Sequence, residues 1–250
     1  MARFENKVAV VTGSGGGIGE GYAKGLAAEG ASVVVAELNE EGGKRVADEI
    51  NASGGKAVFV RTDVSDEQSC LDMGAAAVDA FGGVDYLVNN AAIYKGMRMD
   101  STLTVDWSYW KKFMSVNMDG AMLATRAVYK SMQERGGGAI VNQSSTAAYM
   151  GAGYYGIAKL ALNGITHTLA KELGWSNIRV NAIAPGMTDT EATREIVPKE
   201  IESELFKQMP IQRMGQVDDM VPMCLFLLSD EASFITGQIF QVDGGQVMRV

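Results

Sequence analysis

The sequence predicts a single doubly wound α/β domain, with a central parallel sheet of about seven strands and helices on both of its faces. Short runs rich in Val, Ile and Ala alternate with longer amphipathic stretches along the whole chain. The short runs are almost continuously apolar, which is typical of parallel strands buried on both faces. No repeat, low-complexity tract or linker interrupts the alternation, so we expect residues 1–250 to form one Rossmann-type domain.

The first half of the chain contains three strand–helix pairs and a fourth strand. The apolar runs "VAVVTG", "SVVVAEL", "AVFVRTDV" and "DYLVNNA" predict strands at 8–13, 32–38, 57–64 and 85–91. The longer stretches that follow them have helical length and periodicity, and predict helices at 18–29, 40–52, 66–81 and about 103–134.

The second half continues the alternation and then becomes less regular. The runs "GAIVNQSS" and "IRVNAIAPG" predict strands at 138–145 and 178–186, with a long helix at 155–173 between them. An irregular segment follows, and the chain is expected to end with a helix at 217–229 and a strand, "QIFQVDGG", at 238–245.

Composition and charge exclude several classes of protein. Apolar residues make up 47% and charged residues 21% of the chain, which is a globular composition. A net charge of -8 without a basic tract argues against nucleic acid and anionic membrane as partners. No apolar stretch approaches the roughly 20 residues of a membrane helix, and the amino terminus does not resemble a signal peptide. Cys70, Cys224 and the single His167 lack metal-ligand spacing, so we expect reduced thiols, a cytoplasmic protein and no metal site.

A glycine cluster, "GSGGGIG", follows the first predicted strand. Gly13, Gly17 and Gly19 form a G-x3-G-x-G arrangement, which differs from the G-x-G-x-x-G of many dinucleotide-binding proteins. Both arrangements permit a tight turn and let a pyrophosphate approach the backbone at the start of a helix. We therefore predict a dinucleotide site here. The absence of a G-x4-G-K-[ST] sequence argues against a nucleotide-hydrolysing P-loop.

An acidic residue at the end of the second predicted strand indicates which dinucleotide binds. Glu37 follows the last glycine of the cluster by 18 residues, where a carboxylate can accept hydrogen bonds from the adenosine ribose hydroxyls and repel a 2′-phosphate. No basic residue lies within the glycine cluster or directly beside Glu37, so the sequence predicts NAD rather than NADP. Asp63 is expected at the same sheet edge, near the adenine. It could instead cap the third helix, a position for which Ser65 and Asp66 compete.

One tyrosine–lysine pair stands at helical spacing in the stretch "SSTAAYMGAGYYGIAK". Tyr155 and Lys159 are four residues apart, so they share a helix face, and the ammonium favours the phenolate of a tyrosine that is otherwise a poor base. Only one other tyrosine has a basic residue four positions on: Tyr94, with Arg98, in a glycine-containing segment that we expect to be a loop. Tyr155 is therefore the tyrosine best placed to act as a proton-transfer group, although such a pair can also be two ordinary surface residues. The neighbouring tyrosines expected to pack or to line a substrate pocket are Tyr149 and Tyr154.

These motifs together resemble those of the short-chain dehydrogenase/reductase family from end to end. The matching segments are "TGSGGGIG" at 12–19, "DV" at 63–64, "NNAA" at 89–92, "VN" at 116–117, "SS" at 144–145, "YGIAK" at 155–159 and "PG" at 185–186 with Thr188. Two features depart from the usual pattern. Ala92 replaces a glycine, and the stretch between Ser145 and Tyr155 is shorter than is common in the family.

The resemblance implies four catalytic residues and a larger set of cofactor contacts. Tyr155 would move the proton, Lys159 would lower its pKa and bind the nicotinamide ribose, Ser145 would bind the substrate oxygen, and Asn117 would support a water relay to Lys159. Ser144 is the alternative to Ser145. The residues implied to bind NAD are Gly13, Ser14, Gly15, Gly17, Ile18, Gly19, Glu37, Leu38, Asp63, Val64, Asn90, Ala91, Ala92, Tyr155, Lys159, Pro185, Gly186 and Thr188.

The implied reaction is reversible hydride transfer between NAD and a secondary alcohol, which gives a ketone. The segment at about 187–214 resembles the family's variable substrate lid. A mainly apolar pocket, suited to a cyclic, aromatic, terpenoid or steroid alcohol, is predicted from Met97, Tyr149, Met150 and Met187.

Two alternatives to this function stay open. A 3-oxoacyl thioester reductase is the alternative within the family, and Glu37 argues against the NADP that its acyl-carrier form usually takes. A non-catalytic dinucleotide-sensing protein is the alternative of another class, since a fold does not determine a function. Such proteins often lose the tyrosine or the lysine, which this chain retains. Family members are commonly tetramers, so the resemblance also implies a homotetramer.

Overall fold

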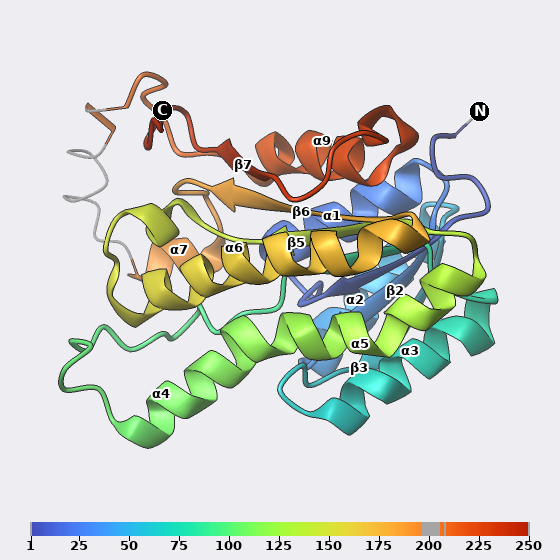
Figure 1. The fold of residues 1–250 in the computed structure, drawn as a ribbon, viewed down its shortest axis with the longest axis horizontal. Helices are drawn as coiled ribbons and strands as arrows, with labels where there is room; N and C mark the ends of the chain where they lie inside the picture. Colours follow the sequence, from blue (N-terminus) through green and yellow to red (C-terminus); the bar gives the residue numbers. More distant parts are fainter. Residues whose placement is uncertain (1, 197–205, 208, 250) are drawn as a thin grey trace.

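Figure 1 shows the computed structural model, which describes residues 2–196, 206–207 and 209–249. Its centre is one seven-stranded sheet in which all strand pairs are parallel, in the order β3-β2-β1-β4-β5-β6-β7. The predicted doubly wound α/β fold with seven strands is therefore confirmed. The strands are β1 (Val8–Thr12), β2 (Ser32–Glu37), β3 (Lys56–Arg61), β4 (Tyr86–Asn89), β5 (Gly138–Gln143), β6 (Ile178–Pro185) and β7 (Ile239–Val242).

Helices cover both faces of the sheet and bury a separate core on each (Figure 1). The core on one face includes side chains from α1 (Gly17–Ala28), α2 (Glu40–Ala52) and α9 (Val217–Leu228). The core on the other face includes side chains from α3 (Glu67–Phe81), α5 (Gly120–Glu134) and α6 (Gly153–Leu173). Cys70 lies in one core and Cys224 in the other, and both are buried free thiols, as expected.

The predicted helix at 103–134 is wrong in its start and in its continuity. It begins as α4 (Trp107–Met114), because the Asp106 carboxylate accepts hydrogen bonds from the backbone N–H groups of Ser108 at 2.9 Å and Tyr109 at 3.1 Å. A π-helical turn, η1 (Ser115–Asp119), then separates α4 from α5. Such turns insert a residue into a helix and often occur at functional sites, and Asn117 lies within this one.

The other predicted boundaries differ from the structure by a few residues. Asp66 caps α3, since its carboxylate accepts from the Ser69 N–H at 2.7 Å, which resolves the choice left open among three residues. A short 3₁₀ helix, η2 (Thr146–Tyr149), stands between β5 and α6 and was not predicted. No helix in the described residues is long and apolar enough to cross a membrane.

The two ends of the segment predicted as a lid, at about 187–214, are joined by a backbone bridge. Thr188 and Gly215 form a parallel bridge, in which the Asp189 N–H donates to the Gly215 carbonyl at 2.7 Å. The described part of this segment includes α7 (Glu191–Ile196). Residues 197–205 and 208 of the predicted lid lie outside the described residues.

The order of the strands locates the site. The chain runs outward from β1 to β3 and then returns to place β4 on the other side of β1. In open parallel sheets, ligands bind beyond the carboxyl ends of the strands at such a point of reversal. The β1–α1 turn and the segment after β4 meet there.

Candidate active site

The turn between β1 and α1 requires glycine for steric reasons. Gly13 has a φ of 63°, and a Cβ atom on it would lie 2.6 Å from the Cα of Ala91. A Cβ atom on Gly19 would lie 2.2 Å from the Gly13 carbonyl oxygen, so this glycine lets α1 start directly against the turn. Gly17 has a φ of 56°, in the left-handed region that favours glycine. The extended Gly16 precedes α1 without a side-chain cap.

The segment after β4 holds this turn from the other side. Asn90 donates through Nδ2 to the carbonyl oxygens of Gly13 at 2.8 Å and Thr12 at 3.1 Å. The Thr12 hydroxyl accepts from the backbone N–H groups of Asn90 and Ala91. The hydroxyl of Ser14 is buried and donates to the Val11 carbonyl, so only the backbone of Ser14 is exposed at the turn. Asn90 and Ala91 thus shape the turn itself.

Glu37 stands at the end of β2 with its carboxylate directed to the glycine turn. It accepts from the N–H of Gly15 at 3.0 Å and from the N–H of Asn39 at 2.9 Å. A Cβ atom on Gly15 would lie 2.7 Å from the Glu37 Cγ atom, so the two residues are in close contact. The neighbouring Leu38 side chain is about half exposed. These contacts fix the carboxylate beside the turn.

Two arginines near Glu37 and the glycine turn, Arg45 and Arg61, were missed by the sequence analysis. Arg45 on α2 donates to the Gly15 carbonyl at 3.1 Å and also pairs with Glu20 and Glu49. Lys24 pairs with the same two glutamates. Arg61 is the partner of Glu37 in the β2–β3 register, and among the described residues no ion pair joins the two. Arg45 and Arg61 come from the next helix and the next strand, so local sequence around Glu37 could not reveal them.

Asp63 and Val64 extend beyond β3 at the same edge. The Asp63 carboxylate accepts from the Ser65 hydroxyl at 2.6 Å and the Ser65 N–H at 2.9 Å, and these bonds lower the pKa of Asp63 below its ordinary value. The Val64 side chain packs against Gly120, where an added Cβ atom would lie 2.7 Å from Val64 Cγ2. Asp63 is therefore an anion at the sheet edge, and it does not cap α3.

Ser145, Tyr155 and Lys159 come together from η2 and α6. The Ser145 hydroxyl lies close enough to the Tyr155 phenol to influence its pKa, and the Lys159 ammonium lies 5.8 Å from the centroid of the Tyr155 ring. Lys159 is buried and donates to the Gln143 carbonyl at 2.7 Å. Tyr155 is half-buried, so its phenol lies between the core and the open side of the site.

Burial shifts the pKa values of both members of the pair. Burial, followed by the adjacent Tyr94 phenol, raises the pKa of Tyr155, and the hydrogen bond with Ser145 opposes the rise. Burial also lowers the pKa of Lys159 to about 8. In the protein alone, desolvation therefore outweighs any effect of Lys159 on the pKa of Tyr155, because it disfavours both charged forms, and the predicted role of Lys159 stays a prediction. The pair requires a further positive charge beside the phenol to favour the phenolate.

The two adjacent serines have different surroundings. Ser144 is buried, and its hydroxyl donates to Asn163 Oδ1 at 2.6 Å, with a second contact of 3.3 Å to the Lys159 carbonyl. The Ser145 hydroxyl accepts from the Ala147 N–H at 3.1 Å, which caps η2, and contacts the phenol of Tyr155. Ser144 is thus committed to the core, whereas Ser145 faces the tyrosine.

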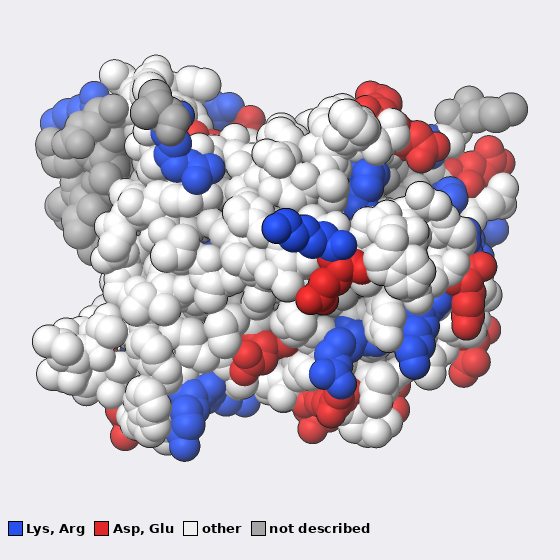
Figure 2. Space-filling view, in the orientation of Figure 1, with Lys and Arg blue, Asp and Glu red and all other residues white. Residues whose placement is uncertain are grey.

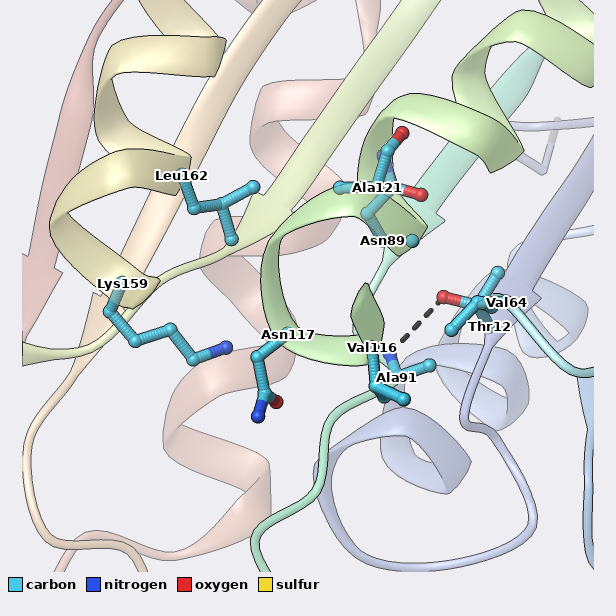
Figure 3. Close-up of a pocket in the computed structure, with 10 residues that line it drawn as sticks. Thr12, Val64, Asn89, Ala91, Val116, Asn117, Ala121, Lys159 and Leu162 are labelled. Carbon is cyan, nitrogen blue, oxygen red and sulfur yellow. Dashed lines mark hydrogen bonds between the residues drawn. The ribbon is translucent and has the colours of Figure 1, made fainter. Parts of the chain in front are cut away.

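Asn117 and Lys159 line a small internal cavity of about 10 Å³ (Figure 3). The side chain of Lys159 extends toward Asn117, and Thr12, Asn89 and Leu162 are also in the lining. Asn117 donates to the Ile93 carbonyl at 3.3 Å, but its Oδ1 atom and that of Asn89 are buried and without a hydrogen-bond partner. The cavity has about the volume that one water molecule requires, and unpaired polar atoms of this kind are the partners that buried water needs.

The "PG" segment closes the site beyond β6. Gly186 donates to the Val242 carbonyl at 3.1 Å, and a Cβ atom on it would lie 2.9 Å from the Asp243 Cα atom. Thr188 is buried, and its hydroxyl donates to the Gly186 carbonyl at 3.2 Å. The Pro185 carbonyl accepts from the Thr146 hydroxyl next to Ser145, so this segment is tied to η2.

The carboxyl-terminal residues, absent from the sequence prediction, also contact η2. Gln246 Oε1 lies 3.4 Å from the Thr146 hydroxyl, and its Nε2 lies 3.8 Å from the Met150 sulfur. The Arg249 guanidinium covers the Tyr149 ring at 3.9 Å from the centroid. The Tyr149 hydroxyl accepts from Asn163 at 3.0 Å. These contacts join segments about a hundred residues apart, and no local sequence signal marks them.

The residues present fit a dinucleotide. The glycine turn leaves backbone groups that a Cβ atom would cover, α1 begins without a side-chain cap, and a carboxylate stands at the end of β2. A doubly wound sheet with this turn at its point of reversal, and a serine–tyrosine–lysine cluster beside it, defines a Rossmann-type oxidoreductase.

Comparison with known proteins identifies the family. A family model described as enoyl-(acyl carrier protein) reductase matches residues 13–246. An uncharacterized oxidoreductase of Mycobacterium tuberculosis is 63% identical over 246 residues, which cover 98% of this chain and 99% of the relative. The human dehydrogenase/reductase SDR family member 4 is 38% identical over 251 residues, which cover 98% of this chain and 89% of the relative. The chain therefore belongs to the short-chain dehydrogenase/reductase family of oxidoreductases.

A solved structure resembles the whole chain closely. A 7α-hydroxysteroid dehydrogenase complexed with NADH and 7-oxo glycochenodeoxycholic acid superposes with a TM-score of 0.93 at 35% identity, covering 99% of this chain and 97% of that one. A short-chain type dehydrogenase/reductase from Mycobacterium ulcerans gives a TM-score of 0.92 at 34% identity, covering 97% of this chain and 90% of that one. These relatives support a nicotinamide dinucleotide as the cofactor.

Proposed function

We propose that this protein transfers a hydride between NAD(H) and a secondary alcohol or its ketone, acting on a cyclic, aromatic or otherwise apolar substrate. The observation that carries the proposal is the cluster of Ser145, Tyr155 and Lys159 next to the glycine turn. When bound, NAD supplies the hydride acceptor for alcohol oxidation, and NADH the donor for the reverse reaction.

Tyr155 moves the proton in this proposal. In oxidation its phenolate oxygen takes the proton of the alcohol hydroxyl, and in reduction its phenol returns a proton to the ketone oxygen. Ser145, whose hydroxyl lies beside the Tyr155 phenol, donates to the substrate oxygen and stabilises the charge that develops there.

Lys159 and Asn117 support this proton transfer. Burial lowers the pKa of Lys159 to about 8, so it remains mainly charged at neutral pH and can exchange protons near the working range. Its ammonium adds positive charge near the phenol and binds the nicotinamide ribose, as the family resemblance implies. A water in the cavity beside Asn117 links Lys159 to further proton exchange.

Glu37 supports the preference for NAD over NADP. Its carboxylate is fixed beside the turn by two backbone N–H groups, where it accepts from ribose hydroxyls and repels a 2′-phosphate. The nearby Arg45 and Lys24 are already paired with glutamates. Arg61 is the remaining cation that could bind a 2′-phosphate. Glu37 lies directly beside Arg61 in the β2–β3 register, where its carboxylate repels such a phosphate.

The side chains around Tyr155 support an apolar substrate. Tyr155 adjoins a cluster centred on Phe113 and Tyr154, against which Met97 also packs. Met150 is about half exposed, and Met187 is partly buried at the base of the proposed lid. The solved relative holds a steroid with its NADH, which supports an alicyclic substrate here as well.

We also propose that the protein assembles as a homotetramer with a lid over the site. Exposed apolar side chains on the outer face of α6, Ile157 at 45% and Leu160 at 55%, are suited to an interface between copies. Figure 2 shows largely uncharged surface where α6 begins, while Lys, Arg, Asp and Glu intermingle elsewhere on this face. Sedimentation velocity of the wild type and of Leu160→Glu tests the assembly, and a monomeric wild type contradicts it.

A substrate panel tests the proposed reaction. Secondary alcohols and their ketones, among them cyclohexanol, an aryl alcohol, a hydroxysteroid and a 3-oxoacyl thioester, are assayed by NADH and NADPH absorbance, with Tyr155→Phe as the control. We expect NAD-linked turnover of cyclic or aromatic alcohols that Tyr155→Phe abolishes. Tight NADH binding without turnover of any compound would favour a dinucleotide-sensing protein instead.

A further inference from the structure

Tyr94 is the second tyrosine with a basic residue four positions on, and the structure separates the two. Arg98 directs its Nε to Asp100 at 2.9 Å, and its guanidinium lies 4.9 Å from the centroid of the Tyr109 ring. Arg98 therefore does not serve Tyr94 in the way that Lys159 accompanies Tyr155. Tyr94 follows the "NNAA" segment after β4, and nothing so far assigns it a function.

The Tyr94 ring instead packs against the proposed proton donor. Its centroid lies 5.5 Å from that of Tyr155, with the two rings inclined at 45°. Phe113, at 6.5 Å, is the other aromatic ring near Tyr155 in the described part of the chain, and it is fully buried. Tyr94 is only half-buried. Of these two neighbours, only Tyr94 can therefore offer ring surface to a molecule whose oxygen lies at Tyr155.

The segment that carries Tyr94 is held from three sides. The Tyr154 hydroxyl, on α6, donates to the Arg98 carbonyl, and the Tyr109 hydroxyl, on α4, accepts from the Arg98 N–H at 3.1 Å. Lys95 pairs with Glu191 at 2.6 Å and with Glu195 at 3.3 Å, both on α7 of the proposed lid. Lys95 and Arg98, which follow Tyr94, are thus tied to helices, and Ile93, which precedes it, accepts from Asn117 Nδ2 at 3.3 Å. These contacts on both sides of Tyr94 fix the ring as a wall of the site.

We infer that Tyr94 is a specificity-determining residue whose ring forms one wall of the substrate site, beside the reacting oxygen. This inference rests on the proposed alcohol–ketone function. A flat or cyclic carbon skeleton attached to the carbinol carbon can stack or pack edge-on against a fixed aromatic ring, with centroids about 4.5–7 Å apart. A flexible acyclic chain gains less from a fixed ring, because it loses more rotational freedom when it is ordered. The wall therefore selects secondary alcohols whose carbinol carbon lies in a ring or directly beside one.

Two alcohols with equal carbon counts test this wall: 1-phenylethanol, which carries an aromatic ring, and 2-octanol, which is acyclic. Each is measured as a substrate with NAD, and as a ligand of the enzyme–NADH complex, in which no hydride transfer can occur. The variants are Tyr94→Ala, which removes the ring, and Tyr94→Phe, which keeps it. Met99→Ala is the matched control, because Met99 belongs to the same segment and is 75% exposed.

We expect the wild type to favour 1-phenylethanol in both kcat/KM and binding. Tyr94→Ala should lose about tenfold for 1-phenylethanol, equivalent to about 1.4 kcal/mol, and less than about twofold for 2-octanol. Tyr94→Phe and Met99→Ala should keep the wild-type preference. NADH affinity should be the same in all four proteins, which separates loss of the wall from unfolding.

Other outcomes overturn either this inference or the proposed function. A wild type that binds both alcohols equally, or neither, overturns the wall, as does a Tyr94→Ala variant that keeps the preference. Equal losses in Tyr94→Phe and Tyr94→Ala would show that the hydroxyl acts, not the ring. Ring-dependent binding of 1-phenylethanol to the NADH complex without turnover would support the wall while refuting the proposed function.

Discussion

Replacing each of the two adjacent serines with alanine should separate stability from catalysis. Ser144→Ala leaves the buried Asn163 Oδ1 without the hydroxyl that now donates to it at 2.6 Å. Leaving a buried acceptor unpaired costs about 1–3 kcal/mol. A loss of about 2 kcal/mol lowers the Tm of a chain of this length by about 4–8 °C.

Ser145→Ala should reduce turnover strongly and stability only slightly. It removes the cap of η2, which costs about 1 kcal/mol, and the hydroxyl that contacts Tyr155. If this hydroxyl binds the substrate oxygen, turnover should fall about 10²–10³-fold. The two variants are compared by thermal unfolding, NADH binding and steady-state kinetics. A Ser144→Ala variant that loses turnover at an unchanged Tm, together with a mild Ser145→Ala variant, would refute the assignment of the two serines.

Three further predictions concern the cofactor site and the lysine. Glu37→Ser with Leu38→Arg should narrow or reverse a preference for NAD that we expect to be roughly tenfold to a thousandfold, about 1.4–4 kcal/mol; equal kcat/KM of the wild type with both cofactors would refute the role of Glu37. Gly19→Ala should abolish NADH binding, measured by calorimetry, because its Cβ atom would lie 2.2 Å from a backbone oxygen. Gly16→Ala should retain NADH binding, because a Cβ atom there would have no neighbour within 4 Å and the backbone is extended, with a φ of -176°. Similar NADH binding by both variants would count against the steric argument. Burial lowers the pKa of Lys159 to about 8 in the folded protein, so between about pH 8 and 10.5 the unfolded chain holds a proton on Lys159 that the folded protein has lost. The free energy of unfolding of the wild type should therefore rise with pH in that window, relative to Lys159→Met, by up to about 3 kcal/mol. Parallel pH dependences of the two proteins in urea titrations would show that this pKa is not lowered.

Features that depend on neighbouring residues in the chain could be predicted from the sequence. The strands follow from apolar runs, and the glycine turn from its place between a strand and a helix. The pairing of Tyr155 with Lys159 could be predicted because residues four positions apart lie on the same face of a helix. The doubly wound fold class with about seven parallel strands was predicted and is confirmed, because right-handed crossovers leave few arrangements of alternating strands and helices.

Features that depend on tertiary packing could not be predicted in this way. The register that places Arg61 beside Glu37 is a property of two strands in contact, and Arg45 reaches the turn from α2. The π-helical turn around Asn117 interrupts a stretch whose periodicity indicated one continuous helix. The pKa of Tyr155 was expected to fall because Lys159 is near in sequence, but it rises because burial is decided by the whole fold.

The turnover of Tyr155→Phe tests the central claim most directly. The substitution removes one oxygen and leaves the ring that packs between Tyr94 and Phe113, so folding and NADH binding should persist. The proton then has no acceptor, and kcat should fall by at least the roughly 10²–10⁴-fold that general acid/base catalysis contributes. Tyr129→Phe, on α5 and outside the site, is the matched control and should keep wild-type rates. A Tyr155→Phe enzyme with a near wild-type kcat would contradict the account.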